Sequence, residues 1–288
     1  MLRAILETGD RQANRTGIDA VSMPGYMLRF DLTQGFPAVT TKKLFFDTGV
    51  VGELVGFLRG YDNAADFRKL GCNIWNDNAN KNKTWLANPN RKGEDDLGRI
   101  YGVQWRSWHS KTNLYHHPDD RACVFMKTES LDQVQKALDT IKNDPTNRRI
   151  IVNAWRPDEF DQMSLPPCHI LYQFLCNVER KELSMCMYQR SCDSFLGVPF
   201  NIASSALFLS IIAKLTGYTP RWFTHFLADA HIYVNHFDAV NEQLSRSPFI
   251  LPKLQLSDRD WTVDTIEPTD IQLINYQHHP AIKAPMAI

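Results

Sequence analysis

The longest apolar stretch of the chain covers residues 200–217, FNIASSALFLSIIAKLTG, and it limits the available folds more than any other feature. Apolar side chains would occupy almost every face of a helix this long, so other parts of the chain must cover it on nearly all sides. The stretch contains Lys214 and falls short of the roughly 18 apolar residues typical of a membrane span. We therefore expect a helix in the core of the protein.

The first half of the chain shows shorter patterns around this helix. Residues 24–32 alternate like a strand, and residues 36–46 are a further extended piece. Residues 49–71 have helical apolar spacing with glycines inside and at the ends, which predicts two short helices. Residues 76–96 are polar and rich in asparagine, as is typical of a surface loop or an insertion.

An amphipathic helix is predicted at residues 130–145, SLDQVQKALDTIKNDP. Ser130 is the expected N-cap, and the Asn-Asp-Pro sequence ends the helix. The apolar stripe consists of Leu131, Val134, Leu138 and Ile141.

The second half of the chain adds more strands. Residues 148–155 are typical of a buried strand, and residues 169–193 predict a hairpin that turns at the charged ERKE sequence. Residues 226–246 begin extended and become helical, and the last fifteen or so residues are irregular. Strands and helices alternate without a regular βαβ rhythm, which indicates an α+β fold on a mixed, largely antiparallel sheet. No composition shift marks a linker, so one domain covering residues 1–288 is expected.

Charge and cysteine content exclude several kinds of protein. Lys and Arg together number 32, as do Asp and Glu, so no overall positive field attracts nucleic acid or an anionic membrane. An anionic ligand must then be bound by a local cluster of arginines. The six cysteines show no spacing typical of a zinc site, and the N-terminus lacks the apolar region of a signal peptide. We expect a cytoplasmic protein with reduced thiols and no metal.

Cys168 lies in the sequence SLPPCHILYQF, directly after two prolines and before a histidine. Prolines restrict the backbone, which suits a side chain that must be held in place. Only the thiolate is a nucleophile, and nearby cations such as Arg190 or the Arg148-Arg149 pair would favour it. The alternative is an ordinary buried thiol, because free cysteine is among the most buried residue types.

Several arginines are candidates for an anion site. Arg15 lies in a turn-like NRTG sequence, Arg148 and Arg149 follow a proline turn, and Arg190 precedes Ser191. A guanidinium group matches phosphate geometry, and a serine hydroxyl adds a donor. Most arginines are simply solvated, so each one alone is a weak indication.

Four further residues have both a structural and a functional interpretation. Asn201 precedes the apolar helix and could cap it, or its carboxamide could bind the N3–H and O4 edge of a uracil. His231 and Tyr233 are two residues apart on a strand-like segment, where they could bind a sugar hydroxyl or lie at a sheet margin. Glu53 lies in an apolar helix, either on an exposed stripe or in a functional site.

Together these segments resemble the thymidylate synthase family. The match runs in order through NRTG, GFPAVTTKK, ELVGFLRG, NIW, DLGRIYGVQWR, NDPTNRRIIVNAW, LPPCH, YQRSCDSFLGVPFNIAS, DAHIYVNH and IKAPMAI. The resemblance implies conversion of dUMP to dTMP, with 5,10-methylenetetrahydrofolate as donor of both the carbon and the hydride. It also implies a homodimer that packs through its sheets and shares arginines between subunits, with no membrane or nucleic acid as main partner.

The resemblance assigns a role to each candidate residue. Cys168 is the expected nucleophile at pyrimidine C6. The other catalytic residues implied are Glu53, Tyr101, His169, Arg190 and Asp193. The substrate-binding residues implied are Arg15, Arg148, Arg149, Gln189, Ser191, Asn201, His231 and Tyr233, with Arg148 and Arg149 reaching the phosphate from the other subunit. The residues implied for the folate site are Trp75, Asn78, Leu165, Asp193, Gly197, Phe200 and Ala287, over which the C-terminal tail closes.

The chain departs from the usual family pattern in four places. The segment between the TTKK lysines and Glu53 is one residue longer, Ala228 replaces a common glycine, and Asn76 replaces a common aspartate. Residues 80–95 look like a family-variable insertion.

The sequence leaves two alternatives to the conversion of dUMP to dTMP. A related hydroxymethylase would finish the reaction with water in place of hydride, and a dCMP-specific one is expected to have aspartate at position 201. Asn201, Trp75 and the intact tail favour dUMP and hydride transfer. RNA-binding regulation is the remote alternative, and the zero net charge argues against it.

Overall fold

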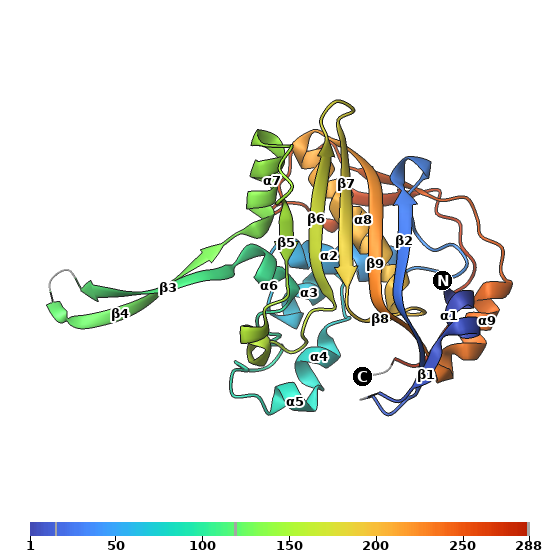
Figure 1. The fold of residues 1–288 in the computed structure, drawn as a ribbon, viewed down its shortest axis with the longest axis horizontal. Coiled ribbons are helices and arrows are strands. Elements are labelled where there is room, and N and C mark those ends of the chain that lie inside the picture. The colour runs from blue at the N-terminus through green and yellow to red at the C-terminus, as the bar shows by residue number, and fades with distance from the viewer. Residues whose placement is uncertain (15, 118–119, 287–288) are drawn as a thin grey trace.

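The computed structural model describes the chain except residues 15, 118–119 and 287–288 and the side chains of residues 111–128. It has an α+β architecture with a mixed sheet, as the sequence predicted (Figure 1). The strands follow the order β1-β2-β9-β7-β6-β5, with β8 also beside β9. Pairing is antiparallel except that β9 runs parallel to β7 and β8. The sheet strands are β1 (Asp10–Gln12), β2 (Ala20–Asp31), β5 (Ile151–Asn153), β6 (His169–Asn177), β7 (Glu182–Gln189), β8 (Cys192–Asp193) and β9 (Thr219–Tyr233).

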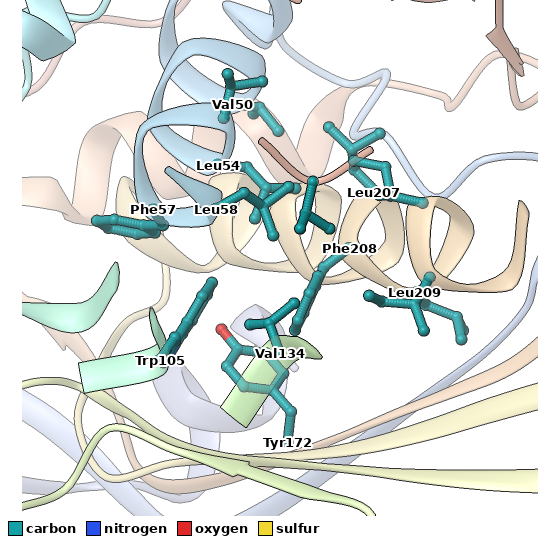
Figure 2. Packing of buried hydrophobic residues seen from close by; sticks show 14 of the residues in the cluster. Val50, Leu54, Phe57, Leu58, Trp105, Val134, Tyr172, Leu207, Phe208 and Leu209 are labelled. Carbon is teal, nitrogen blue, oxygen red and sulfur yellow. The ribbon is translucent and has the colours of Figure 1, made fainter. Parts of the chain in front are cut away.

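Helix α8 (Gly197–Thr216) packs on one face of this sheet (Figure 1). By length and composition it could cross a membrane, but most of it is buried inside the protein. The Trp105 ring stacks on Phe208 of α8 with 5.2 Å between centroids, and Tyr172 of β6 meets Phe208 edge-on at 5.3 Å (Figure 2). Burying an aromatic or large aliphatic side chain contributes about 1.5–3 kcal/mol, so these contacts hold the helix firmly against the sheet.

The remaining elements surround this core. The helices are α1 (Leu2–Thr8), α2 (Gly52–Leu58), α3 (Ala64–Lys69), α4 (Asn76–Asn80), α5 (Lys83–Leu86), α6 (Tyr101–Arg106), α7 (Gln133–Asn143) and α9 (Phe237–Ser245). Short 3₁₀ turns occur at Leu32–Gln34, Pro157–Gln162, Val234–His236 and Pro268–Asp270. A π-helical turn, η2 (Phe46–Val51), leads directly into α2. Two small ribbons are β3 (Trp108–His117) with β4 (Asp120–Leu131), and β10 (Lys253–Leu256) with β11 (Ile271–Ile274).

Several predicted elements are confirmed. The hairpin of β6 and β7 turns over the ERKE sequence, with Asn177 paired to Glu182. The segment from 226 onward continues β9 and then forms α9. The strand predicted at 24–32 corresponds to β2, which begins earlier, at Ala20, and ends at Asp31, one residue before the predicted end.

Other predictions were wrong in detail. The cap of α7 is Asp132, whose carboxylate accepts from the Gln135 amide at 2.9 Å, and Ser130 belongs to β4. The strand expected at 148–155 is confined to β5, where Ile151 is exposed and Val152 is buried. Ser130 is taken up by pairing with His109 of β3, and β5 is defined by pairing with β6, so both depend on partners that local sequence does not contain.

Residues 36–45 form no strand, although several of their side chains are buried. Tyr276 takes the place of a strand partner, because its hydroxyl accepts from the Leu44 amide at 2.9 Å and donates to the Val39 carbonyl at 2.6 Å. The β3–β4 ribbon, which projects from the body, was not predicted (Figure 1).

Candidate active site

A cavity of about 660 Å³ opens beside Cys168 at one end of the sheet. Its lining combines the Cys168 turn, the β7–β8 connection and β9, segments that are far apart in sequence. Arg190 and Ser191 contribute cationic and hydroxyl groups, and His231 and Tyr233 contribute polar groups with aromatic rings. Such a cavity can bind an anionic molecule that also carries hydroxyl groups.

Cys168 is partly exposed in this cavity, so the buried-thiol alternative does not describe it. The turn that carries it is fixed from two directions. Its amide donates to the Tyr101 hydroxyl at 2.8 Å, and its carbonyl accepts from the Arg190 amide at 2.9 Å. The Arg190 guanidinium donates to the carbonyls of Pro167 at 2.9 Å and Pro166 at 2.8 Å.

Arg190 therefore positions the Cys168 turn and lines the same cavity. The guanidinium also lies over the Trp155 ring, 5.3 Å from its centroid. A positive charge in the lining of this cavity attracts an anionic ligand.

The other five cysteines were expected to be ordinary thiols. Burial raises the pKa of Cys72 to about 12, and burial also raises the pKa of Cys176, Cys186 and Cys192. Cys123 lies among the residues whose side chains are not described.

A second group of polar residues does not line the cavity and consists of His169, Gln189, Asn201 and His225. Asn201 is the fifth residue of α8 and does not cap it, because the helix begins after Leu196. Its Oδ1 accepts from Gln189 Nε2 at 2.9 Å, and Gln189 Oε1 lies 2.8 Å from His225 Nε2. Burial lowers the pKa of His169 to about 4 although a hydrogen bond with Asn201 opposes this shift. A neutral network therefore holds the Asn201 carboxamide in one orientation.

Glu53 lies on α2 and is not on an exposed stripe. Its Oε1 accepts from Trp75 Nε1 at 3.1 Å. Burial raises the pKa of Glu53 to about 7 against the opposing effect of that hydrogen bond. Tyr101 is buried nearby, and burial followed by the neighbouring Cys168 raises its pKa well above the ordinary value. A carboxyl group with a pKa near neutrality can accept and donate a proton at physiological pH.

His231 and Tyr233 both lie on β9, and their rings contact each other at 5.1 Å between centroids. Sequence reasoning missed Asp229, which lines the same cavity. Asp229 Oδ2 lies 3.3 Å from His231 Nδ1, and its Oδ1 accepts a short hydrogen bond from Ser22. Burial lowers the pKa of His231, but the hydrogen bond and charge of Asp229 outweigh it and raise the pKa overall. Two-residue spacing on a strand was the available signal for Asp229.

Asp193 ends β8 and organises the start of α8. Its Oδ1 accepts from the amides of Phe195 at 3.0 Å and Leu196 at 2.9 Å. Gly197 and Phe200 follow in the first turns of α8, and Phe200 packs directly on Gly49 of η2. A Cβ atom added at Gly49 would lie only 2.6 Å from the Phe200 ring, so a larger residue would not fit there without a shift of that ring.

Some predicted residues lie elsewhere. Arg148 and Arg149 are exposed between α7 and β5, and in the described part of the chain neither guanidinium has an ion-pair partner. Asn78 is partly exposed on α4 and does not line the cavity. Arg15 and Ala287 lie outside the described residues. Among the described residues, no group of three His, Cys, Asp or Glu side chains is arranged to hold a metal.

Comparison with known proteins gives one consistent result. A family model described as Thymidylate synthase matches residues 1–288. A protein of Pseudomonas syringae pv. tomato named Thymidylate synthase is 47% identical, covering 99% of this chain and 97% of its own length. Proteins with that name from Pseudomonas putida and Bordetella parapertussis are 47% and 45% identical, each covering 100% of this chain and 98% of the relative.

Proposed function

This chain belongs to the thymidylate synthase family, and from that premise we propose how its residues divide the work. The enzyme is a methyltransferase that converts dUMP to dTMP, with 5,10-methylenetetrahydrofolate as co-substrate. The observation that carries the residue assignment is the partly exposed Cys168 in a cavity shared with Arg190, Ser191, His231 and Tyr233.

Three sets of residues in or beside this cavity orient the substrate. Arg190, Ser191 and Arg15 bind the 5′-phosphate, and His231 and Tyr233 bind the deoxyribose 3′-hydroxyl. Asn201 binds the uracil edge, and Gln189 fixes the direction of its carboxamide. A nucleotide bound at three points presents C6 to the Cys168 sulfur, which lowers the entropic cost of the attack.

Covalent catalysis begins when the Cys168 thiolate adds to C6 of the uracil. The new S–C bond moves the C5–C6 electron pair toward C5 and O4, so C5 becomes nucleophilic toward the one-carbon unit. The folate carbon forms a bond to C5, and loss of the C5 proton together with cleavage of the bond between that carbon and the folate nitrogen gives an exocyclic methylene group. A hydride from the folate reduces this group to methyl, and departure of the Cys168 thiolate restores the C5–C6 double bond, with dihydrofolate as the second product. Glu53, Tyr101 and His169 direct these proton movements, which the near-neutral pKa of Glu53 suits.

We place the folate next to the nucleotide, against Trp75, Asn78, Leu165, Asp193, Gly197, Phe200 and Ala287. Trp75 and Leu165 lie near the Glu53 side and the Cys168 side of the site respectively. The C-terminal tail already approaches α9, because the Pro285 carbonyl lies 2.7 Å from His236 Nε2. Closure of this tail excludes water from the reacting groups.

The protein acts as a cytoplasmic homodimer, with each chain a single catalytic domain. A row of large apolar side chains, Met27, Phe226 and Tyr188, crosses three neighbouring strands on the face of the sheet away from α8. All three are exposed in the single chain, at 56%, 39% and 42%, and such a patch indicates a protein partner. Packing of two sheets brings the exposed Arg148 and Arg149 to the phosphate of the other subunit.

Product analysis tests the activity. Purified protein with dUMP and 5,10-methylenetetrahydrofolate is expected to yield dTMP and dihydrofolate, whose formation is followed by absorbance. A 5-hydroxymethyl nucleotide and tetrahydrofolate would instead show the hydroxymethylase reaction, which the relatives do not favour. Cys168→Ala is expected to abolish turnover and keep dUMP binding, and turnover in this variant would exclude the assigned nucleophile.

A further inference from the structure

The asparagine-rich segment 76–96 is part of the active-site wall. The sequence suggested a surface loop, but the segment forms α4 and α5 and buries Trp85, whose Nε1 donates to the Asp96 carbonyl at 2.6 Å. Asn82, Thr84 and Asn88 line the same cavity as Cys168. A loop with only a solubilising role would not be anchored by a buried tryptophan and would not face the cavity.

Side-chain amides of this segment bind the loop that leads to Cys168. Asn82 Nδ2 donates to the Ser164 carbonyl at 2.9 Å. Asn88 and Asn90 each donate from Nδ2 to the Asp161 carbonyl, at 2.9 and 3.0 Å. The Ser164 amide in turn donates to the Leu97 carbonyl at 2.9 Å. Residues 161–164 are therefore held almost entirely by the segment and its C-terminal end.

Asn82 has two separate functions in this arrangement. Its Oδ1 caps α5 by accepting from the amides of Thr84 at 3.1 Å and Trp85 at 3.4 Å. Its Nδ2 makes the bond to Ser164. Serine or aspartate can perform the capping function, but neither has a donor that reaches the Ser164 carbonyl. An asparagine is the residue that meets both requirements.

The two ends of the loop are held independently. Asn82 holds Ser164, whereas Arg190 and Tyr101 hold Pro166, Pro167 and Cys168. Leu165 lies between the two anchors and lines the cavity. Loss of the Asn82 bond would leave the Ser164 carbonyl, and with it the peptide that leads to Leu165, without its side-chain donor, while the Ser164 amide stays bonded to Leu97 and Arg190 and Tyr101 still hold the nucleophile.

We propose that Asn82 is a positioning residue that sets the affinity for the folate co-substrate, because it holds Ser164 and thereby Leu165 in the cavity wall. This inference rests on the proposed contact of Leu165 with folate. It assigns an active-site role to a residue of the segment that the family resemblance marks as a variable insertion.

Asn82→Ser tests the proposal, since serine keeps the cap and removes the donor. Asn63→Ser is the matched control: Asn63 caps α3 by accepting from the Ala65 amide at 2.9 Å, and its Nδ2 donates to no atom in the described part of the chain. Loss of one hydrogen bond of this kind corresponds to roughly a five- to ten-fold effect. We expect Asn82→Ser to raise KM for 5,10-methylenetetrahydrofolate by about that factor, with the Kd for dUMP and the Tm close to those of Asn63→Ser.

Hydrogen exchange gives a readout that does not depend on activity. The amides of Ser164 and Leu165 are expected to exchange faster in Asn82→Ser than in wild type, and those of Arg190 and Ser191 at the wild-type rate. An unchanged folate KM in Asn82→Ser would overturn the proposal, as would an equal weakening of dUMP and folate binding with a lowered Tm. Failure of the wild-type protein to form dTMP would instead contradict the proposed function.

Discussion

Asn201 and Asp229 show at the residue scale what local sequence does and does not indicate. The resemblance gave Asn201 a base-binding role, and local sequence favoured a cap. The structure excludes the cap, because Asn201 lies inside α8 and bonds Gln189 of β7. Two-residue spacing from His231 was the only local signal for Asp229, because its partner Ser22 is separated from it by 207 positions. A hydrogen bond to a distant strand leaves no mark in the local sequence.

Replacing Asn201 with aspartate tests base recognition. The carboxamide can donate to O4 and accept from N3–H of uracil, whereas a carboxyl group better matches the N3 and amino edge of cytosine. Asn201→Asp is expected to lower kcat/KM for dUMP by about a hundred-fold and to raise binding of dCMP relative to dUMP. Both are measured with purified protein by steady-state kinetics and calorimetry. An unchanged preference for uracil would show that other groups choose the base.

Glu53 gives a prediction for the pH dependence of stability. Burial raises its pKa from 4.5 to about 7, so the folded state holds the proton more tightly than the unfolded state. The group therefore favours folding at low pH, and this contribution is lost as pH rises from about 4.5 through about 7. Relative to Glu53→Gln, which does not titrate, the wild-type free energy of unfolding is expected to fall by about 3 kcal/mol between pH 5 and pH 8.

Denaturant unfolding of both proteins across this pH range measures the difference. A difference that does not vary with pH would mean that Glu53 has an ordinary pKa, and its proposed acid–base role would lose its basis.

At the scale of elements, the sequence predicted those whose pattern is local. The β6–β7 hairpin and the helix at 237–245 follow from periodicity and turn residues, and the structure confirms them. Residues 36–46 were predicted to be an extended piece because several of their side chains are apolar, as suits buried positions. Residues 36–45 form no strand, and the Tyr276 hydroxyl, in place of a strand partner, bonds the Leu44 amide and the Val39 carbonyl. The asparagine-rich segment 76–96 was predicted to be a surface loop or an insertion. Its contacts could not be predicted, because an asparagine amide that binds a distant carbonyl and a solvated one look the same in sequence.

The π-helical turn η2 would accommodate the extra residue that the family resemblance implies before Glu53. The Gly52 amide bonds the Asp47 carbonyl, a five-residue spacing that holds one residue more than an α-turn. Asp47 and Thr48 are exposed, whereas Gly49 packs on Phe200. We therefore expect the wide turn to take up an additional residue on its solvent side, at Asp47 and Thr48, without a change in the orientation of α2.

Deletion of Thr48 is therefore expected to convert the turn to an α-turn and to keep dTMP synthesis within about three-fold of wild type. Insertion of one alanine after Val51 is the control, because it rotates Glu53 by about 100° around the helix axis and should abolish activity. Initial rates and circular dichroism of both variants check the result. A folded but inactive Thr48 deletion would show that the wide turn itself is needed to direct Glu53.

At the scale of the whole molecule, two surface features of the single chain call for a partner. Arg148 and Arg149 are exposed and lack an ion-pair partner in the described residues, and the apolar row of Met27, Phe226 and Tyr188 is uncovered. Both features are accounted for together if a second copy packs on the sheet and each chain supplies these arginines to the other. Composition alone could not indicate this, because an arginine that reaches into a partner's site and one that is only solvated have the same local sequence pattern.

Mixed dimers test this arrangement. The Cys168→Ala variant and the Arg148→Ala/Arg149→Ala double variant are each expected to be nearly inactive alone. If the arginines act in the partner's site, a mixed dimer combines both defects in one site and leaves the other site intact. Random reassociation of equal amounts makes half of the dimers mixed, so about a quarter of wild-type activity should return.

Activity is measured after the two variants are unfolded and refolded together, and each variant refolded alone is the control. If the mixture stays inactive while sedimentation shows dimers, the arginines serve their own chain, and the apolar row then packs two complete sites back to back.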